Sequence, residues 1–157
     1  MLPPLSGRPI RVEIRRTLEA HHAATSIPRR QIFLDAGVLL RPGEFERILI
    51  HELFHFVWVR LGNRRRREWE RCLVREVAAR ARGELGWSAE SRKRRLTAGD
   101  CRNRTRRWRS YACESFCDTA AWMYGSVRRH DEFTLSVFSR RRRRAWFRRH
   151  VQSGVGL

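Results

Sequence analysis

The chain has 157 residues, which is enough for one domain with its own core and too few for two. Its formal net charge is +19, from 35 basic against 16 acidic residues, and Lys93 is the only lysine. No apolar run approaches membrane-spanning length, so length and composition exclude a two-domain enzyme and a membrane-spanning protein.

The positive charge predicts an attraction to polyanions such as nucleic acid, acidic peptides or an anionic membrane surface. The preference for arginine has a second source, because CGN codons are favoured in GC-rich genomes. Because part of the positive charge can be attributed to this codon preference, we count the charge only half as strongly as evidence for a nucleic-acid partner. The first nine residues lack the apolar region of a secretory signal, so we expect a cytoplasmic location.

The first third of the chain predicts a small sheet. Residues 9–16 alternate apolar and charged side chains, as in a half-buried strand. Residues 17–24 are expected to form a short helix or a turn. We discount His21 and His22 as a metal site, because adjacent residues on a helix do not face one another. Residues 30–40 predict two short strands around an Asp-Ala-Gly turn.

A long helix is predicted from Pro42 to Leu61, because proline suits the first helical turn and Gly62-Asn63 ends the pattern. A second helix is predicted over residues 64–82 by an apolar stripe. Residues 83–99 are expected to form a loop. The basic cluster of this loop, residues 92–95, could contact phosphates. We prefer the interpretation that these side chains are simply exposed to solvent on the surface.

A third helix is predicted over residues 106–124. The basic amphipathic segment that follows could bind nucleic acid or a membrane surface. We expect instead that Trp146, Phe147 and Val151 dock it onto the core, because a small domain needs that apolar area.

The four cysteines lack Cys-x-x-Cys spacing and are expected to be reduced. Cys113 and Cys117 fall on the same side of the expected third helix, where a disulfide bridge or a soft-metal site is conceivable. Small buried thiols are the preferred interpretation.

The pattern His-Glu-x-x-His lies inside the expected long helix. His51 and His55 are four positions apart, so they project from one face and can reach one metal ion. Glu52 lies close enough to take a proton from a metal-bound water without being a ligand. The alternative is a buried helix whose histidines only pack or hydrogen-bond. We prefer a zinc hydrolase, because the residues around the motif are uncharged although 32% of the chain is charged.

A catalytic zinc has three protein ligands and an open position for water, so a third ligand is expected downstream. Glu114, in the third helix, is the best candidate. Asp118 follows one helical turn later and could hydrogen-bond the far nitrogen of a ligating histidine, which would fix its tautomer.

His51-Glu52-x-x-His55 followed by Glu114-x-x-x-Asp118 resembles the gluzincin metallopeptidases, which include the thermolysin-like enzymes and the single-domain minigluzincins. The resemblance covers about half of the chain and is limited to the minimal catalytic unit. It implies one zincin-like domain over residues 1–157. The implied fold is α+β, with a small N-terminal β-sheet packed on the motif helix and a helical C-terminal part.

The resemblance also implies the chemistry. Zn²⁺ held by His51, His55 and Glu114 would activate water to hydrolyse a peptide or protein substrate, with Glu52 as the general base. In zincins an edge strand before the metal helix binds extended substrate. One of the two short strands predicted in residues 30–40 could supply that edge. The alternative, which is equally compatible with the sequence, is that these strands are ordinary sheet core.

Gluzincins generally add a His or Tyr donor for the oxyanion, and Tyr111, Tyr124 and His130 are the candidates here. No glycine-rich or asparagine-rich signature marks that position, which departs from the family pattern. A second hypothesis is therefore a catalytically weak or inactive zincin relative that acts as a nucleic-acid-binding or regulatory protein. A third hypothesis is a regulatory peptidase of a group that shares the His-Glu-x-x-His helix and cuts a repressor protein. It ranks lower, because the residues around Glu114 fit the second motif of that group poorly.

Overall fold

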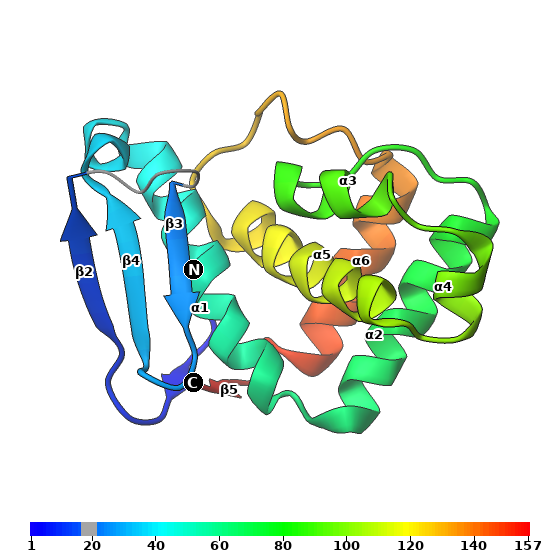
Figure 1. Cartoon of the computed structure of the whole chain (residues 1–157), viewed down its shortest axis with the longest axis horizontal. Helices are drawn as coiled ribbons and strands as arrows, with labels where there is room; N and C mark the ends of the chain where they lie inside the picture. The colour runs from blue at the N-terminus through cyan, green and yellow to red at the C-terminus, as the bar shows by residue number, and fades with distance from the viewer. Residues whose placement is uncertain (17–21) are drawn as a thin grey trace.

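The computed structural model describes residues 1–16 and 22–157. Figure 1 shows a small β-sheet at one side of the molecule and a larger helical part at the other. The described elements are β1 (Leu5–Ser6), β2 (Arg11–Arg15), β3 (Ala23–Ser26), β4 (Gln31–Asp35), a 3₁₀ helix (Ala36–Leu40), α1 (Pro42–Arg60), α2 (Gly62–Ala78), α3 (Trp87–Lys93), α4 (Ala98–Arg102), α5 (Arg106–Tyr124), α6 (Val137–His150) and β5 (Val155–Gly156). The expected α+β class with a small sheet and a mainly helical remainder is confirmed.

The larger sheet has the strand order β2-β4-β3, with β2 parallel and β3 antiparallel to β4. Ile32 and Leu34 of the central strand are fully buried and pack with Phe56 of α1. Val12 and Ile14 of β2 are each 44% exposed, because α1 packs on β3 and β4 and leaves β2 at the margin. The strand expected in residues 9–16 therefore exists, but it is less buried than its alternation predicts.

Residues 30–40 contain one strand rather than the two expected. The side chain of Asp35 accepts a hydrogen bond from the N–H of Gly37 and starts a 3₁₀ helix where the second strand was expected. Because β4 is paired on both sides, this run cannot supply a free edge. The expected short helix or turn falls mainly on residues 17–21, including His21, which lie outside the described residues, while residues 23 and 24 belong to β3.

The predicted helices over residues 42–61 and 106–124 are confirmed as α1 and α5. The expected second helix begins two residues earlier and ends at Ala78. The expected loop over residues 83–99 is wrong, since it contains α3 and the start of α4. Thr97 and Asp100 form a capping box at the start of α4, each side chain bonding the other residue's N–H, and this signal is present in the sequence.

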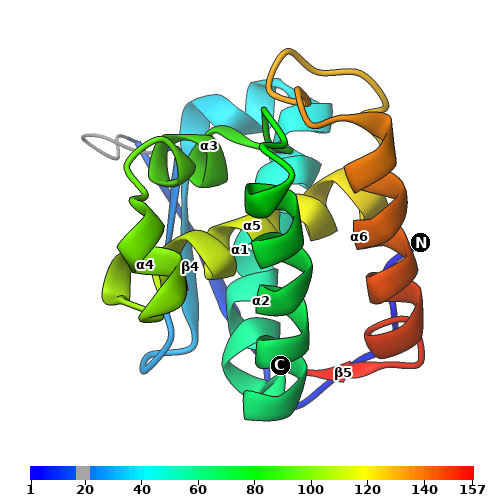
Figure 2. The ribbon, with the colours of Figure 1, turned by 90° about the vertical axis from the view of Figure 1, so that its right-hand side faces the viewer.

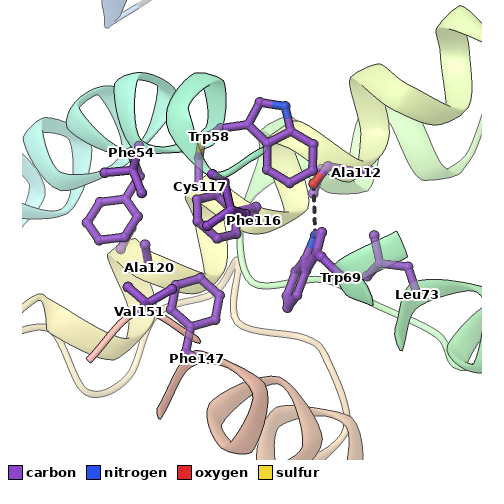
Figure 3. Close-up of a cluster of buried hydrophobic side chains, with 14 of the residues drawn as sticks. Phe54, Trp58, Trp69, Leu73, Ala112, Phe116, Cys117, Ala120, Phe147 and Val151 are labelled. Carbon is purple, nitrogen blue, oxygen red and sulfur yellow. Dashed lines mark hydrogen bonds between the residues drawn. The ribbon is translucent and has the colours of Figure 1, made fainter. Parts of the chain in front are cut away.

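The core forms around α5, which packs against the other five α-helices of the described chain. Aromatic rings from several helices meet there (Figure 3), with the centroids of Phe116 and Phe147 4.9 Å apart. The indole N–H of Trp69 donates to the carbonyl of Ala112 at 3.0 Å. Phe147 and Val151 are fully buried, which confirms that α6 docks onto the core. Figure 2 shows α6 beside α2.

A buried ion cluster ties these helices together. The fully buried Arg143 of α6 donates to Glu76 at 2.6 Å and to Glu84 at 2.7 Å. Glu84 also accepts from the hydroxyl of Tyr111 at 2.6 Å and lies 3.1 Å from Nζ of Lys93. Burial raises the pKa of the Glu84 carboxyl, but the charge and hydrogen bonds of Arg143 outweigh burial and hold the pKa below its usual range. The cluster thus links α2, α3, α5 and α6.

We expect Arg143→Met to lower the free energy of unfolding by about 3–5 kcal/mol, because the substitution leaves Glu76 and Glu84 buried without their cation. Chemical denaturation followed by far-UV circular dichroism measures the change. Arg148→Met, on the exposed side of the same helix, is the matched control and should change stability by less than about 0.5 kcal/mol. Equal stability of the two variants would contradict the structural role of the cluster.

Candidate metal centre

A cavity of about 650 Å³ opens between β3, α1, α3 and α5. Helix α1 contributes His51, Glu52 and His55 to its lining, and α5 contributes Glu114 and Asp118. These two groups lie far apart in the sequence, and the packing of α1 on α5 brings them together. The cavity therefore gathers the predicted base, the three predicted ligands and the predicted hydrogen-bond partner.

His51 is engaged at both ring nitrogens. Its Nδ1 lies 2.7 Å from a carboxylate oxygen of Asp118, and its Nε2 lies 3.3 Å from a carboxylate oxygen of Glu114. Burial lowers the pKa of the His51 imidazolium, but the charge and hydrogen bond of Asp118, with a hydrogen bond to Glu114, raise it well above its usual value. Because Asp118 occupies Nδ1, the nitrogen left for a metal is Nε2, on the side of Glu114.

The other oxygen of Asp118 accepts the backbone N–H of Ala89 at 2.9 Å. This bond fixes the first turn of α3 against α5. Gly86 precedes α3, and a Cβ built there would lie 2.3 Å from the carboxyl carbon of Asp118. Only glycine permits so close an approach, so the Asp118 contact constrains the segment before α3 as well.

His55 faces two thiols. Its Nδ1 lies 3.5 Å from Sγ of Cys113 and 3.6 Å from Sγ of Cys117. The pKa of the Cys113 thiol is lowered to about 6. The largest cause is its hydrogen bond with Cys117; burial raises the pKa, and the hydrogen bond and charge of His55 lower it further. Neither cysteine forms a disulfide in the structure.

Potential ligand atoms of His51, His55 and Cys117 all lie within 4.8 Å of one another, so this group could hold a metal ion. Cys117 is fully buried, whereas Glu114 lines the cavity. The sequence analysis ranked a soft-metal role for Cys117 below simple burial. The sequence signal that favours Cys117 as a metal ligand is the i, i+4 spacing of Cys113 and Cys117. This spacing puts both thiols on one face of the helix, and in the structure both lie beside His55.

Glu52 is held by a residue that the sequence did not single out. Its Oε2 accepts the hydroxyl of Thr25 on β3 at 2.6 Å, and both residues line the cavity. Glu52 is 8% exposed. The hydrogen bond occupies one carboxylate oxygen and leaves the other for a proton from water.

Glu114 has a cationic neighbour that the sequence analysis did not single out. Nη2 of Arg92 on α3 lies 3.2 Å from Oε1 of Glu114, and its Nε donates to the hydroxyl of Ser110 at 3.0 Å. Burial raises the pKa of the Glu114 carboxyl, but the hydrogen bond and the charge of His51, together with smaller effects of His55 and Arg92, outweigh burial. The pKa of Glu114 is therefore lowered overall. The carboxylate is therefore stabilised in its ionised form, which is the form that binds metal.

The three candidate oxyanion donors lie away from the cavity lining. The hydroxyl of Tyr111 is buried against Glu84, and Tyr124 stacks on Phe54 in the core with the ring centroids 5.6 Å apart. Nε2 of His130 lies 2.9 Å from a carboxylate oxygen of Glu44. Each group already has packing or hydrogen-bond partners elsewhere in the fold, so the structure does not bring it to the metal centre.

Comparison with protein-family models, curated proteins and solved structures found no match to this chain. Among the described residues, no helix combines the length and the apolar character needed to cross a membrane. The functional interpretation therefore rests on the geometry of the cavity and on the motif residues themselves.

We expect Asp118→Asn to weaken zinc affinity about 10- to 100-fold, because it removes the charged group that orients His51. The measurement is competition with a chromophoric chelator, made at a pH where both motif imidazoles are neutral so that protons do not compete. Asp131→Asn, an exposed acid outside the cavity lining, is the control and should leave affinity unchanged. Unchanged affinity in Asp118→Asn would show that the contact does not support a metal site.

Zinc binding should also depend on pH. A metal binds the neutral imidazole, so a proton on His51 competes with the ion. Because the pKa of His51 is raised, affinity should fall at least about tenfold per pH unit below that pKa and become level only above it. The same chelator competition, repeated from mildly acidic to alkaline pH, measures this. An affinity already level near the usual imidazole pKa of about 6.5 would contradict the prediction.

Proposed function

We propose that this chain is a zinc-dependent metallopeptidase with a zincin-like catalytic site of the gluzincin type. The observation that carries the proposal is the two-sided engagement of His51, with Asp118 at Nδ1 and Glu114 beside Nε2. A catalytic zinc site needs a fixed histidine tautomer, an anionic third ligand and an accessible position for water. The residues around His51 meet the first two needs, and the cavity beside them meets the third.

The choice of Glu114 over Cys117 as third ligand follows from exposure. Glu114 lines the cavity through which a substrate enters, whereas Cys117 is completely buried among core side chains. An ion drawn toward Cys117 would lose the open position that hydrolysis requires. Glu114 is also stabilised as a carboxylate by His51 and Arg92.

A zinc ion bound by His51, His55 and Glu114 would polarise the substrate carbonyl and lower the pKa of its bound water. With Glu52 as the base, the oxygen of a water molecule would attack the carbonyl carbon, and the proton that Glu52 takes from this water would go to the amine as the C–N bond breaks. Thr25 holds one oxygen of Glu52, so the carboxylate keeps one orientation during both transfers.

Arg92 is the cationic side chain best placed to stabilise the developing oxyanion. It lines the cavity, and its guanidinium contacts Glu114 directly. Arg47, the other arginine of the cavity lining, is neutralised by Glu44 and Glu132. Arg92 would therefore take the place that the resemblance assigned to a histidine or tyrosine.

The substrate would bind in extended form along β3. This strand is the outer strand of the sheet on the cavity side, and residues 23–25 line the cavity. Its other edge is bonded to β4, so the edge facing the cavity is left to pair with a peptide main chain. This replaces the edge that was expected from residues 30–40.

A second candidate is a metal-stabilised protein without hydrolytic activity. It is favoured by the grouping of His51, His55 and Cys117, which could form a closed site. A closed site would stabilise the fold and leave Glu52 without a catalytic task. The nature of the ligand atoms separates the two candidates, because only the second places sulfur on the metal.

The test combines metal content, cobalt spectra and hydrolysis. Elemental analysis of the wild type and of Glu52→Gln should give about one zinc per chain, whereas His55→Ala and Glu114→Ala should lose it. The zinc-loaded wild type should cleave a fluorescently labelled unfolded protein. Glu52→Gln should be slower by about 10²- to 10⁴-fold, because it removes the general base and keeps the ligands.

The cobalt-substituted protein decides between the two candidates. The metallopeptidase site has nitrogen and oxygen ligands, so its near-ultraviolet spectrum should lack a thiolate-to-cobalt charge-transfer band. Such a band, lost in Cys117→Ser and kept in Glu114→Ala, would establish the closed site instead. A metal-free wild type after zinc loading would reject both candidates.

A further inference from the structure

The arginines of α6 divide into an inner and an outer set. Arg143 points into the core and is paired with Glu76 and Glu84. The exposed arginines are different, because the helix contains no acidic residue and no ion pair joins them to a carboxylate of the described residues. They are Arg141, Arg144, Arg148 and Arg149.

These four arginines form a stripe on one helix face. With Ala145 they occupy positions i, i+3, i+4, i+7 and i+8, which extend over about 12 Å of helix. The same five residues line an open depression on the surface, in which the small side chain of Ala145 leaves space between the guanidinium groups. The stripe is therefore a concave, uniformly positive surface.

Helix α2 extends this surface, since it lies beside α6 (Figure 2). Its Arg65 is exposed and has no carboxylate partner among the described residues. The pKa of His150, at the end of α6, is lowered overall. Burial is the largest cause, the charge of Glu68 acts in the opposite direction, and the positive charges of Arg65 and Arg149 add to the lowering. Arginines of both helices thus act on one imidazole. We call Arg65, Arg141, Arg144, Arg148 and Arg149 the arginine face.

The carboxylates near this surface have partners other than these five arginines. Glu68 of α2 lies 3.3 Å from Nε of Arg64 and 3.5 Å from Nε2 of His150. Glu70 of α2 binds Arg104 at 2.6 Å. Glu76 is turned into the core, where it binds Arg143.

The guanidinium of Arg144 packs over the Trp122 ring, 4.6 Å from its centroid. Clustered like charges without counter-charges oppose folding, so the fold gives no comparable reason for the other four arginines. A codon preference would account for arginine in place of lysine, but it would not account for four exposed arginines on one face of a helix that contains no acidic residue.

The arginine face is also separate from the metal centre. The cavity is lined by His22, Glu132 and residues of β3, α1, α3 and α5, without a residue of α2 or α6. The metallopeptidase chemistry therefore does not use these arginines. An inference about the arginine face stands or falls independently of the proposed function.

We propose that the arginine face binds the phosphodiester backbone of a nucleic-acid duplex. Guanidinium groups bind phosphate oxygens in pairs, and each phosphate neutralised releases counterions, which makes such contacts favourable at moderate salt. The contacts are to the backbone, so the face reads charge and spacing rather than base sequence. The concave stripe fits a row of phosphates along a strand.

A membrane surface is a poorer match to this geometry. The apolar side of α6, including Phe147, is buried in the core and cannot enter a bilayer. Only Val137 and Phe138, in the first turn, offer large exposed apolar side chains on this helix. Interfacial helices hold a membrane through buried apolar area, and this helix presents little of it.

The test measures binding of the full-length protein to a fluorescein-labelled duplex of random sequence by anisotropy, over a series of salt concentrations. The variant carries Arg141→Gln, Arg144→Gln, Arg148→Gln and Arg149→Gln. The matched control carries Arg8→Gln, Arg11→Gln, Arg16→Gln and Arg29→Gln, which removes the same charge from exposed arginines on the sheet side. Far-UV circular dichroism and thermal unfolding confirm that both proteins are folded.

We expect the α6 variant to bind about 10- to 100-fold more weakly near physiological salt, and the slope of log affinity against log salt to decrease by about 3–4. The control should change that slope by less than about 1. Equal losses in the two proteins would overturn the proposal, because binding would then follow total charge. Unchanged affinity in the α6 variant would also overturn it.

Two further arms complete the test. Replacing the same four residues by lysine keeps the charge and removes paired guanidinium contacts, so it should give a smaller loss and supports the proposal even if the glutamine variant is unstable. Vesicles containing phosphatidylserine test the membrane alternative. Binding to vesicles that is stronger than duplex binding and is lost in the α6 variant would overturn the nucleic-acid assignment.

Discussion

The carboxylate of Asp118 makes the contacts on which the rest of the candidate metal centre depends. One oxygen lies 2.7 Å from Nδ1 of His51 on α1, and the other accepts the N–H of Ala89 on α3. A buried carboxylate engaged at both oxygens fixes α1, α3 and α5 relative to one another. It also decides which nitrogen of His51 faces Glu114. Orientation of the candidate ligand is therefore part of how the helices pack, and glycine at position 86 follows from the same contact.

The chain accommodates its basic composition by sorting charges between the interior and two surfaces. In the interior, carboxylates such as Glu84 neutralise Arg143 and join four helices. At the cavity, Glu52 and Glu114 give the metal centre its anionic character. On the outside of α2 and α6, the five arginines of the arginine face have no carboxylate partner among the described residues. The two proposals assign hydrolysis and phosphate binding to different elements of the domain.

The sequence by itself determined the features that depend on neighbours along the chain. The turn of α1 puts His51 and His55 on one face, and the same spacing separates Glu114 from Asp118 on α5. Pro42 and Gly62-Asn63 marked the ends of α1, and both helices were predicted within one residue at each end. Composition and periodicity were less informative elsewhere. They failed over residues 83–99, where the capping box before α4 outweighed a loop-like composition. Local signals therefore predicted the main helices and the motif residues.

Only the tertiary structure decided which side chains meet. Thr25 reaches Glu52 because β3 packs on α1, and Arg92 reaches Glu114 because α3 packs on α5. Tyr111 shares a helix with Glu114, yet its hydroxyl binds Glu84 in the core. Helical and strand periods fix the face on which a residue lies, but the partner across that face depends on how elements distant in the chain pack. That is why the candidate ligands and the candidate base could be named from the sequence, whereas Thr25 and Arg92, which contact Glu52 and Glu114, could not.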